Sequence, residues 1–208
     1  MTYRYKTVLL FGAPGAGKGT QGKILGKIPG FFHLACGDVF RSIDMTSELG
    51  KQFLLYSSRG ELVPDELTIQ MWRQNMHAQT VLSIFKPKQD LLVLDGIPRN
   101  VKQAEAIQKS LDVLSVIHLR CHDENAMMER MRRRALKENR MDDADDKVIR
   151  HRFEVYHQET FPVLDFYSKS IIANIDAMGS PAQVFQRVLE VVVPVQDAHF
   201  NQPPTTPT

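Results

Sequence analysis

Residues 8–21 read VLLFGAPGAGKGTQ, an apolar run followed by a glycine-rich turn and a lysine. Four consecutive apolar residues are typical of a buried strand, and the turn leads into a helical pattern. Glycines let successive backbone N–H groups turn inward toward an anion. The helix adds its own free N–H groups and the positive end of its dipole, and Lys18 adds a full charge. The stretch therefore predicts a binding site for nucleotide phosphates.

The spacing of Gly12, Gly17 and Lys18 is that of a P-loop, but the position after the lysine differs from the common form. That position is normally Ser or Thr, whereas this chain has Gly19 and places Thr20 one residue later. Glycine-rich junctions without a ligand also exist between strands and helices. The strand before the loop and the helix after it favour phosphate binding here.

The composition is typical of one ordinary globular domain. The chain has 208 residues, 43% of them hydrophobic, and a net charge of +2 that does not indicate a nucleic-acid or membrane partner. Cys36 and Cys121 lie far apart and lack zinc-type spacing, so free thiols in the reducing cytoplasm are expected. Because no run approaches the ~20 apolar residues of a membrane span, we expect no membrane partner and no signal peptide.

Short apolar runs alternate with longer helical patterns. This alternation predicts a three-layer α/β sandwich, a five-stranded parallel sheet with helices on both faces. Ligands of such sheets bind beyond the carboxyl ends of the strands, where the P-loop, Gly37-Asp38 and Asp95-Gly96 should converge. The expected strands are 7–11, 31–34, 91–94, 113–119 and 171–175, and the expected helices are 17–28, 65–84, 101–110, 124–138, 145–169 and 181–192.

Two segments read as insertions into a single domain that spans residues 1–193. Residues 37–64 contain two short helical pieces, and Pro64 with Asp65 marks the start of the next helix. Residues 134–144 form a polar bridge between two long helices. The core is then made of residues 1–36, 65–133 and 145–193. The proline-rich tail, 194–208, is expected to be disordered.

Asp95 ends the apolar run 91–94 and precedes Gly96. A carboxylate at the end of a buried strand beside a P-loop commonly organises Mg²⁺ through water. In isolation, an aspartate that merely forms a turn before a glycine would be the simpler interpretation. With the P-loop in the same sheet, a magnesium site at Asp95 is favoured.

Arginines are concentrated in and around the two insertions. Phosphoryl transfer needs planar, always-charged donors around the moving group, and a site that closes over two nucleotides can take them from two inserts. Surface arginines are usually just solvated, and this interpretation is available for Arg130, Arg132, Arg133 and Arg150. The arginines that favour phosphate contacts are Arg41, Arg99, Arg134, Arg140 and Arg152.

These motifs together resemble the nucleoside monophosphate kinases, most closely the adenylate kinase family with a short lid. The family's phosphate loop resembles Gly12–Gln21 and accounts for Gly19. The start and end of its monophosphate-binding insert resemble 33–41 and 60–65, and its Asp-Gly-aromatic-Pro-Arg segment resembles 95–99. Arg134, the run 140–143 and Arg152 resemble the lid and its exit, so the resemblance covers about residues 7 to 192.

The resemblance implies Mg²⁺-dependent phosphoryl transfer from ATP to AMP, giving two ADP, in adenine nucleotide homeostasis. The implied catalytic residues are Lys18, Arg99, Arg134, Arg140 and Arg152. The implied ATP-binding residues are Gly15, Ala16, Gly17, Lys18, Gly19, Thr20, Arg130, Arg134 and Gly179. The implied AMP-binding residues are Cys36, Arg41, Leu62, Val63, Gly96, Arg99, Gln103, Arg140 and Arg152. The partners are then small nucleotides, without nucleic acid, and the short-lid type suggests a monomer.

Some positions depart from the family pattern. Cys36 stands where the family usually has Thr, and Ile97 stands where it usually has Phe or Tyr. The segment after Arg140 is one residue longer than usual, so either Arg150 or Arg152 can be the phosphate ligand that the family places there. The short lid contains no cysteine, so a zinc-bearing lid is not expected. His118, Cys121 and His122 are interpreted as residues at a strand end rather than metal ligands.

Two alternatives remain open from the sequence. A UMP/CMP kinase-like enzyme would share the P-loop, the arginines and the short lid, and Asn100 is compatible with pyrimidine recognition. Gln103 instead suits adenine, because its amide donates and accepts together. A non-catalytic nucleotide sensor is the other alternative, although Lys18, Asp95 and the lid arginines are all present.

Overall fold

A computed structural model describes residues 3–138, 140 and 143–200. The first half contains β1 (Tyr5–Phe11), α1 (Lys18–Leu25), β2 (Phe31–Ala35), α2 (Cys36–Arg41), α3 (Glu48–Ser57), α4 (Asp65–Val81) and β3 (Leu91–Asp95). The second half contains α5 (Val101–Ile107), β4 (Leu111–Arg120), α6 (Glu124–Glu138), α7 (Asp146–Val155), β5 (Ile172–Asp176) and α8 (Pro181–Phe200).

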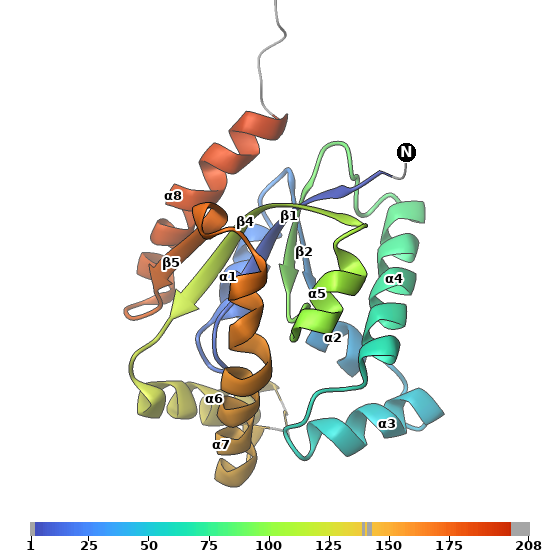
Figure 1. The fold of residues 1–208 in the computed structure, drawn as a ribbon. Helices are drawn as coiled ribbons and strands as arrows, with labels where there is room; N and C mark the ends of the chain where they lie inside the picture. The colour runs from blue at the N-terminus through green and yellow to red at the C-terminus, as the bar shows by residue number, and fades with distance from the viewer. Residues whose placement is uncertain (1–2, 139, 141–142, 201–208) are drawn as a thin grey trace, which may run out of the picture.

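The strands form one parallel sheet in the order β2-β3-β1-β4-β5. Helices cover both faces, with α8 and α4 on opposite sides of the sheet (Figure 1). The five-stranded parallel α/β sandwich expected from the alternating pattern is confirmed. The central strands β1 and β3 are buried on both faces, which explains why they read as continuous apolar runs.

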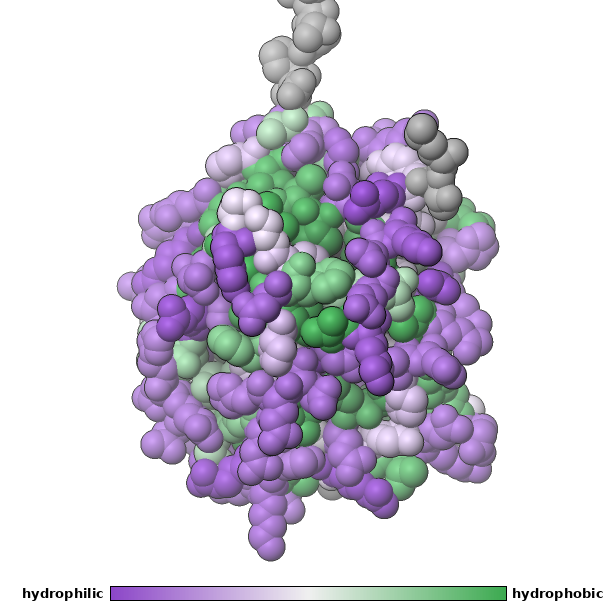
Figure 2. Space-filling view, in the orientation of Figure 1, coloured by the Kyte–Doolittle hydropathy of each residue, from purple (hydrophilic) through white to green (hydrophobic). Residues whose placement is uncertain are grey.

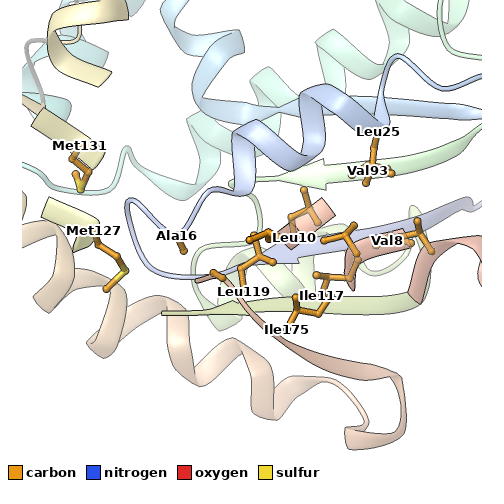
Figure 3. Packing of buried hydrophobic residues seen from close by; sticks show 14 of the residues in the cluster. Val8, Leu10, Ala16, Leu25, Val93, Ile117, Leu119, Met127, Met131 and Ile175 are labelled. Atoms are coloured by element: carbon orange, nitrogen blue, oxygen red, sulfur yellow. The ribbon is translucent and has the colours of Figure 1, made fainter. Parts of the chain in front are cut away.

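Two hydrophobic clusters fill the space between the sheet and its helices. One packs the strands against α1, α6, α7 and α8, and the other packs them against α2, α4 and α5. In the first cluster Ala16 of the phosphate loop lies between Met127 on one side and Leu10 and Leu119 on the other (Figure 3). The loop is therefore anchored directly to the core, which fixes its backbone in front of the strands.

The carboxyl ends of the strands point toward the lower end of the molecule in Figure 1, where α3, α6 and α7 lie. The expected insert 37–64 contains most of α2 and all of α3, as its two short helical patterns predicted. The second insert, 134–144, begins in the last turn of α6, and residues 139, 141 and 142 lie outside the described part. The surface around α6 and α7 is largely hydrophilic (Figure 2).

The expected helical stretch over 145–169 is helical from Asp146 to Phe166, but it is not one α-helix. The α-helix α7 ends at Val155, a π-helical turn follows at Tyr156–Thr160, and a 3₁₀ helix with Pro162 in its first turn covers Phe161–Phe166. A helical periodicity does not distinguish these three hydrogen-bonding patterns, and tertiary contacts of the π-helical turn, described below, select among them.

The expected disorder from residue 194 is also wrong for residues 194–200, because α8 continues through Pro194 to Phe200. Proline inside a helix removes one hydrogen bond, but tertiary contacts hold the last turns here. Lys6 lies 5.0 Å from the centre of the Phe200 ring, and its ammonium donates to the carbonyl of His199. Residues 201–208 lie outside the described residues. Within the described part of the chain, no helix is long and apolar enough to cross a membrane.

Candidate functional site

A cavity of about 650 Å³ opens at the carboxyl ends of the strands, between the phosphate loop and the two inserts. Every residue that the sequence singled out as a nucleotide or magnesium ligand lines this one cavity. They are Gly15, Ala16, Gly17, Lys18, Gly19, Thr20, Cys36, Arg41, Leu62, Val63, Asp95, Gly96, Arg99, Gln103, Arg130, Arg134, Arg140, Arg152 and Gly179. The topology thus brings together residues spread over more than three quarters of the sequence.

The phosphate loop takes a shape that only glycine allows at its tightest points. Gly15 and Gly17 have φ angles of +79° and +98°, and a Cβ on Gly15 would lie 2.6 Å from the carbonyl oxygen of Met127. Gly17 is the N-cap of α1, so the loop leads directly into the free N–H groups at the start of that helix. The arrangement provides an anion-binding helix N-terminus.

Lys18 folds back over the phosphate loop. Its ammonium donates to the carbonyl oxygens of Gly12 at 2.6 Å and Ala13 at 3.1 Å. Loss of hydration lowers the pKa of Lys18 to about 8, with Arg99, Arg134 and Arg152 also disfavouring its charge, while Asp95 favours it. The cavity therefore carries an excess of positive charge that an anion such as a polyphosphate would neutralise.

Asp95 and Thr20 supply the oxygen donors that a hydrated Mg²⁺ ion would need. Asp95 ends β3 with 8% of its surface exposed, and both residues line the cavity beside the phosphate loop. Mg²⁺ commonly uses only one or two carboxylates, with waters and phosphate oxygens completing its shell. The donor set fits such a shared site, although no group of three or more His, Cys, Asp or Glu side chains among the described residues could hold a metal alone.

Arg41 lies at the end of α2, in the first insert. Its guanidinium donates to the carboxylate of Asp38, which also pairs with Lys23 of α1 at 3.5 Å. Although burial alone would raise it, the pKa of Asp38 is lowered, chiefly because the Arg41 side chain donates a hydrogen bond to the carboxylate. The contact holds the Arg41 fork at the wall of the cavity.

Arg99 and Gln103 line the cavity next to the start of the first insert. The guanidinium of Arg99 donates to the carbonyl of Gly96 at 3.1 Å, and its backbone N–H donates to Oε1 of Gln103 at 2.8 Å. The amide nitrogen of Gln103 donates to Asp65 at 2.8 Å. Gln103 is 1% exposed, so these two bonds fix its orientation and leave one N–H and one lone pair for a ligand.

Asn100, which kept the pyrimidine alternative open, has a structural role. Its side-chain oxygen caps α5 by accepting from the backbone of Gln103, and its amide nitrogen donates to Asp65. Asn100 is absent from the cavity lining, which Gln103 shares. Cys36 does line the cavity; burial raises the pKa of its thiol to about 12, so it faces a ligand as a neutral group.

The second insert contributes an arginine cluster around one buried carboxylate. Asp143 is 0% exposed, and its Oδ2 accepts from Nε of Arg134 at 2.7 Å and from Nη2 at 2.6 Å. Its Oδ1 accepts from Arg152 at 2.5 Å, and Nε of Arg140 lies 3.5 Å from Oδ2. One carboxylate thus gathers arginines from α6, from α7 and from the segment between them at the cavity.

The structure separates the arginines that the sequence left undecided. Arg152 lines the cavity, whereas Arg150 is exposed and lies away from its lining. Arg132 pairs with Asp146 on the surface. Arg130 instead lines the cavity and donates to the carbonyl of Ala177 at 3.3 Å, next to Gly179.

Sequence reasoning did not assign a role to Asp143, Tyr156 or Thr160, of which the last two also line the cavity. The signal for Asp143 was present, since it follows Arg140 by three residues in a stretch flanked by arginines. Tyr156 and Thr160 carried no comparable signal, because their significance depends on partners that are distant in sequence.

Comparison with known proteins agrees with this geometry. The family model for adenylate kinase matches residues 10–172. The chain belongs to the adenylate kinase family. It is 39% identical over 188 residues to an adenylate kinase of Thermobifida fusca, covering 88% of this chain and 95% of the relative. It is 38% identical over 192 residues to an adenylate kinase of a Cyanothece species and 36% identical over 188 residues to one of Kocuria rhizophila. These matches cover 89% and 88% of this chain, and 94% and 96% of the relatives.

Proposed function

We propose that this protein catalyses reversible phosphoryl transfer from ATP to AMP, giving two molecules of ADP. The observation that carries the proposal is the convergence of two arginine sets on one phosphate loop. Arg41 and Arg99 lie on the acceptor side, and Arg134 and Arg152 lie on the lid side of the same cavity. Membership of the adenylate kinase family supports the same reaction.

On the donor side, the backbone N–H groups of the phosphate loop and Lys18 would hold the ATP phosphates. Gly15, Gly17 and the N-terminus of α1 supply an anion-binding surface that needs no rearrangement. Arg130 and Gly179 lie at the end of the cavity near Ala177, where they would contact the donor nucleoside. Mg²⁺ held through water at Asp95 would neutralise charge on the phosphates.

On the acceptor side, Arg41 and Arg99 would grip the AMP phosphate, because a planar guanidinium binds phosphate oxygens with two parallel hydrogen bonds. Leu62 and Val63 would contact the nucleoside through their backbones. Arg134, Arg140 and Arg152 would surround the moving phosphoryl group, whose negative charge is spread over its outer oxygens during transfer. Asp143 keeps Arg134 and Arg152 in place before nucleotides arrive.

Gln103 favours adenine over pyrimidines as the acceptor base. Its two protein hydrogen bonds orient the amide, and the remaining N–H and lone pair match the donor and acceptor edge of adenine. A wrong base would leave these buried groups unpaired, which can discriminate strongly between substrates. The capping role of Asn100 removes the residue that had favoured a UMP/CMP kinase-like enzyme.

A coupled assay that follows ADP formation tests this proposal. With ATP as donor, AMP should be phosphorylated well above CMP and UMP, and Gln103→Ala should erode that preference. Equal use of CMP or UMP by the unaltered protein would replace the proposal with the pyrimidine alternative. Nucleotide binding without any transfer would instead support a non-catalytic sensor.

We place the protein in the cytoplasm as a monomer that contributes to nucleotide biosynthesis and adenine nucleotide homeostasis. The free thiols of Cys36 and Cys121 are compatible with a reducing compartment. Mg²⁺ is the proposed metal, and removal with a chelator should abolish transfer while leaving the protein folded, because the described fold is held by its own core.

A further inference from the structure

His118, near the end of β4, joins two segments that the proposed mechanism does not connect. The side chain is 7% exposed, and both ring nitrogens have partners. Nδ1 lies 3.0 Å from Oδ1 of Asn174 on β5, and Nε2 lies 3.1 Å from the hydroxyl of Tyr156. Tyr156 begins the π-helical turn that follows α7, and it is one of the residues that line the nucleotide cavity.

The chemistry of the partners fixes the proton positions in this chain of hydrogen bonds. An amide oxygen only accepts, so Nδ1 of His118 carries the proton and donates to Asn174. Nε2 then accepts from Tyr156, whose hydroxyl keeps its proton because burial raises its pKa to about 12. Burial lowers the pKa of His118 although the hydrogen bond to Asn174 acts to raise it, and the neutral ring is therefore favoured.

The other end of the π-helical turn is tied to the acceptor side of the cavity. The hydroxyl of Thr160 donates to the backbone carbonyl of Arg99 at 2.8 Å. The turn is therefore held at one end by the hydrogen bond between Tyr156 and His118 of the sheet, and at the other end by the hydrogen bond from Thr160 to the backbone of Arg99. Arg152 lies one helical turn before Tyr156, on the same continuous helical segment. π-helical turns are rare and often occur at functional sites.

We propose that His118 is a positioning residue that, through Tyr156 and the π-helical turn, sets the spacing between Arg152 and Arg99 in the nucleotide cavity. This inference rests on the proposed phosphoryl transfer, in which those two arginines contact the moving group and the acceptor. His118 touches neither nucleotide. It holds Tyr156 against the sheet through a hydrogen bond, and Thr160, at the other end of the π-helical turn, holds the backbone of Arg99.

The test removes one oxygen atom from the chain of hydrogen bonds. Tyr156→Phe should lower kcat about 3- to 10-fold, the range expected for one lost neutral hydrogen bond. The KM for ATP should stay within about 2-fold, because the phosphate loop is untouched and a transition-state contact is the one lost. In the protein without nucleotide, amides 152–160 should exchange faster with solvent. Tyr167→Phe is the matched control, since Tyr167 is a partly buried tyrosine that packs against the hydrophobic core outside the cavity lining.

A second variant, Thr160→Val, removes the hydrogen bond from Thr160 to the carbonyl of Arg99 and should give a similar loss of kcat. If both ties act through one turn, the double variant should lose less than the product of the single losses. Unchanged kcat and exchange in Tyr156→Phe, or an equal loss in Tyr167→Phe, would overturn the inference. An inactive wild-type protein would count against the proposed function alone, because the exchange measurement needs no activity.

Discussion

Replacing Asp143 by Asn would remove the negative charge around which the lid-side arginines assemble. The substitution keeps the size of the side chain and one acceptor oxygen. The other terminal atom becomes an NH₂ donor, so either Arg134 or Arg152 would face a donor in place of its carboxylate oxygen. The remaining arginine would keep only a neutral hydrogen bond.

The cost can be bounded from the burial of the partners. Removing one member of a fully buried ion pair costs about 3–5 kcal/mol, and a hydrogen bond to a charged group contributes about 1.5–3 kcal/mol. Asp143 is 0% exposed, but the Arg134 and Arg152 side chains are 29% and 15% exposed and can turn toward water. We therefore expect a loss of about 2–3 kcal/mol, which lowers Tm by roughly 4–12 °C for a chain of this size.

Activity should fall more steeply than stability. Losing one preorganised donor to a transition state costs about 10²–10³ in turnover, so kcat for ATP and AMP should drop at least ~10²-fold. Thermal unfolding and the coupled assay measure the two effects on the same samples. Asp146→Asn is the matched control, because its pair with Arg132 is half exposed and outside the cavity, so Tm and turnover should stay close to those of the unaltered protein. Near wild-type turnover in Asp143→Asn would refute the assigned role of Asp143.

Lys18→Met should lower turnover ~10²–10³-fold yet raise Tm at pH 7, because burial disfavours the charged lysine in the folded state. The pKa of Lys18 is about 8 in the folded protein and 10.5 ordinarily, so the wild-type protein should gain stability relative to the variant as the pH rises from about 8 to 10.5. The same change of Tm with pH in both proteins would contradict this. Arg99→Ala should weaken AMP binding far more than ATP binding in separate titrations, and equal weakening would exclude an acceptor-side role. Cys36→Thr should lower the KM for AMP modestly, since one neutral hydrogen bond contributes only ~0.5–1.5 kcal/mol; a changed choice of base would oppose this reasoning. Residues 37–63 and 134–144 should gain hydrogen-exchange protection with a bisubstrate analogue, and no gain in either would argue for a rigid site.

The sheet and the cavity could be predicted because their signals are local. Apolar runs such as 91–94 mark central strands regardless of context, and the rule that ligands bind at strand carboxyl ends places the P-loop beside Asp95. The inserts predicted Arg41, Arg134 and Arg140 at the cavity, whereas Arg133, which was interpreted as a solvated surface residue, also lines it. For these features, composition and order along the chain carry most of the information.

The features that the sequence did not predict depend on tertiary partners. The π-helical turn at 156–160 is too short for its hydrophobic pattern to differ from that of an α-helix, and its hydrogen bonds to His118 and Arg99 favour it. The last turns of α8 persist past Pro194 because its end contacts Lys6. The engagement of Gln103 with Asp65 likewise joins residues 38 positions apart. No local pattern indicates such pairings.

The phosphoryl group is proposed to pass between two nucleotides that share one cavity. ATP labelled with ³²P at the γ-phosphate, mixed with AMP and the protein, shows where that group goes. Label should appear in the β-phosphate of ADP, with little released as inorganic phosphate, since both nucleotides are bound when the phosphoryl group moves. Label that appears only as inorganic phosphate, or stays in ATP, would show that the protein does not transfer the group to AMP.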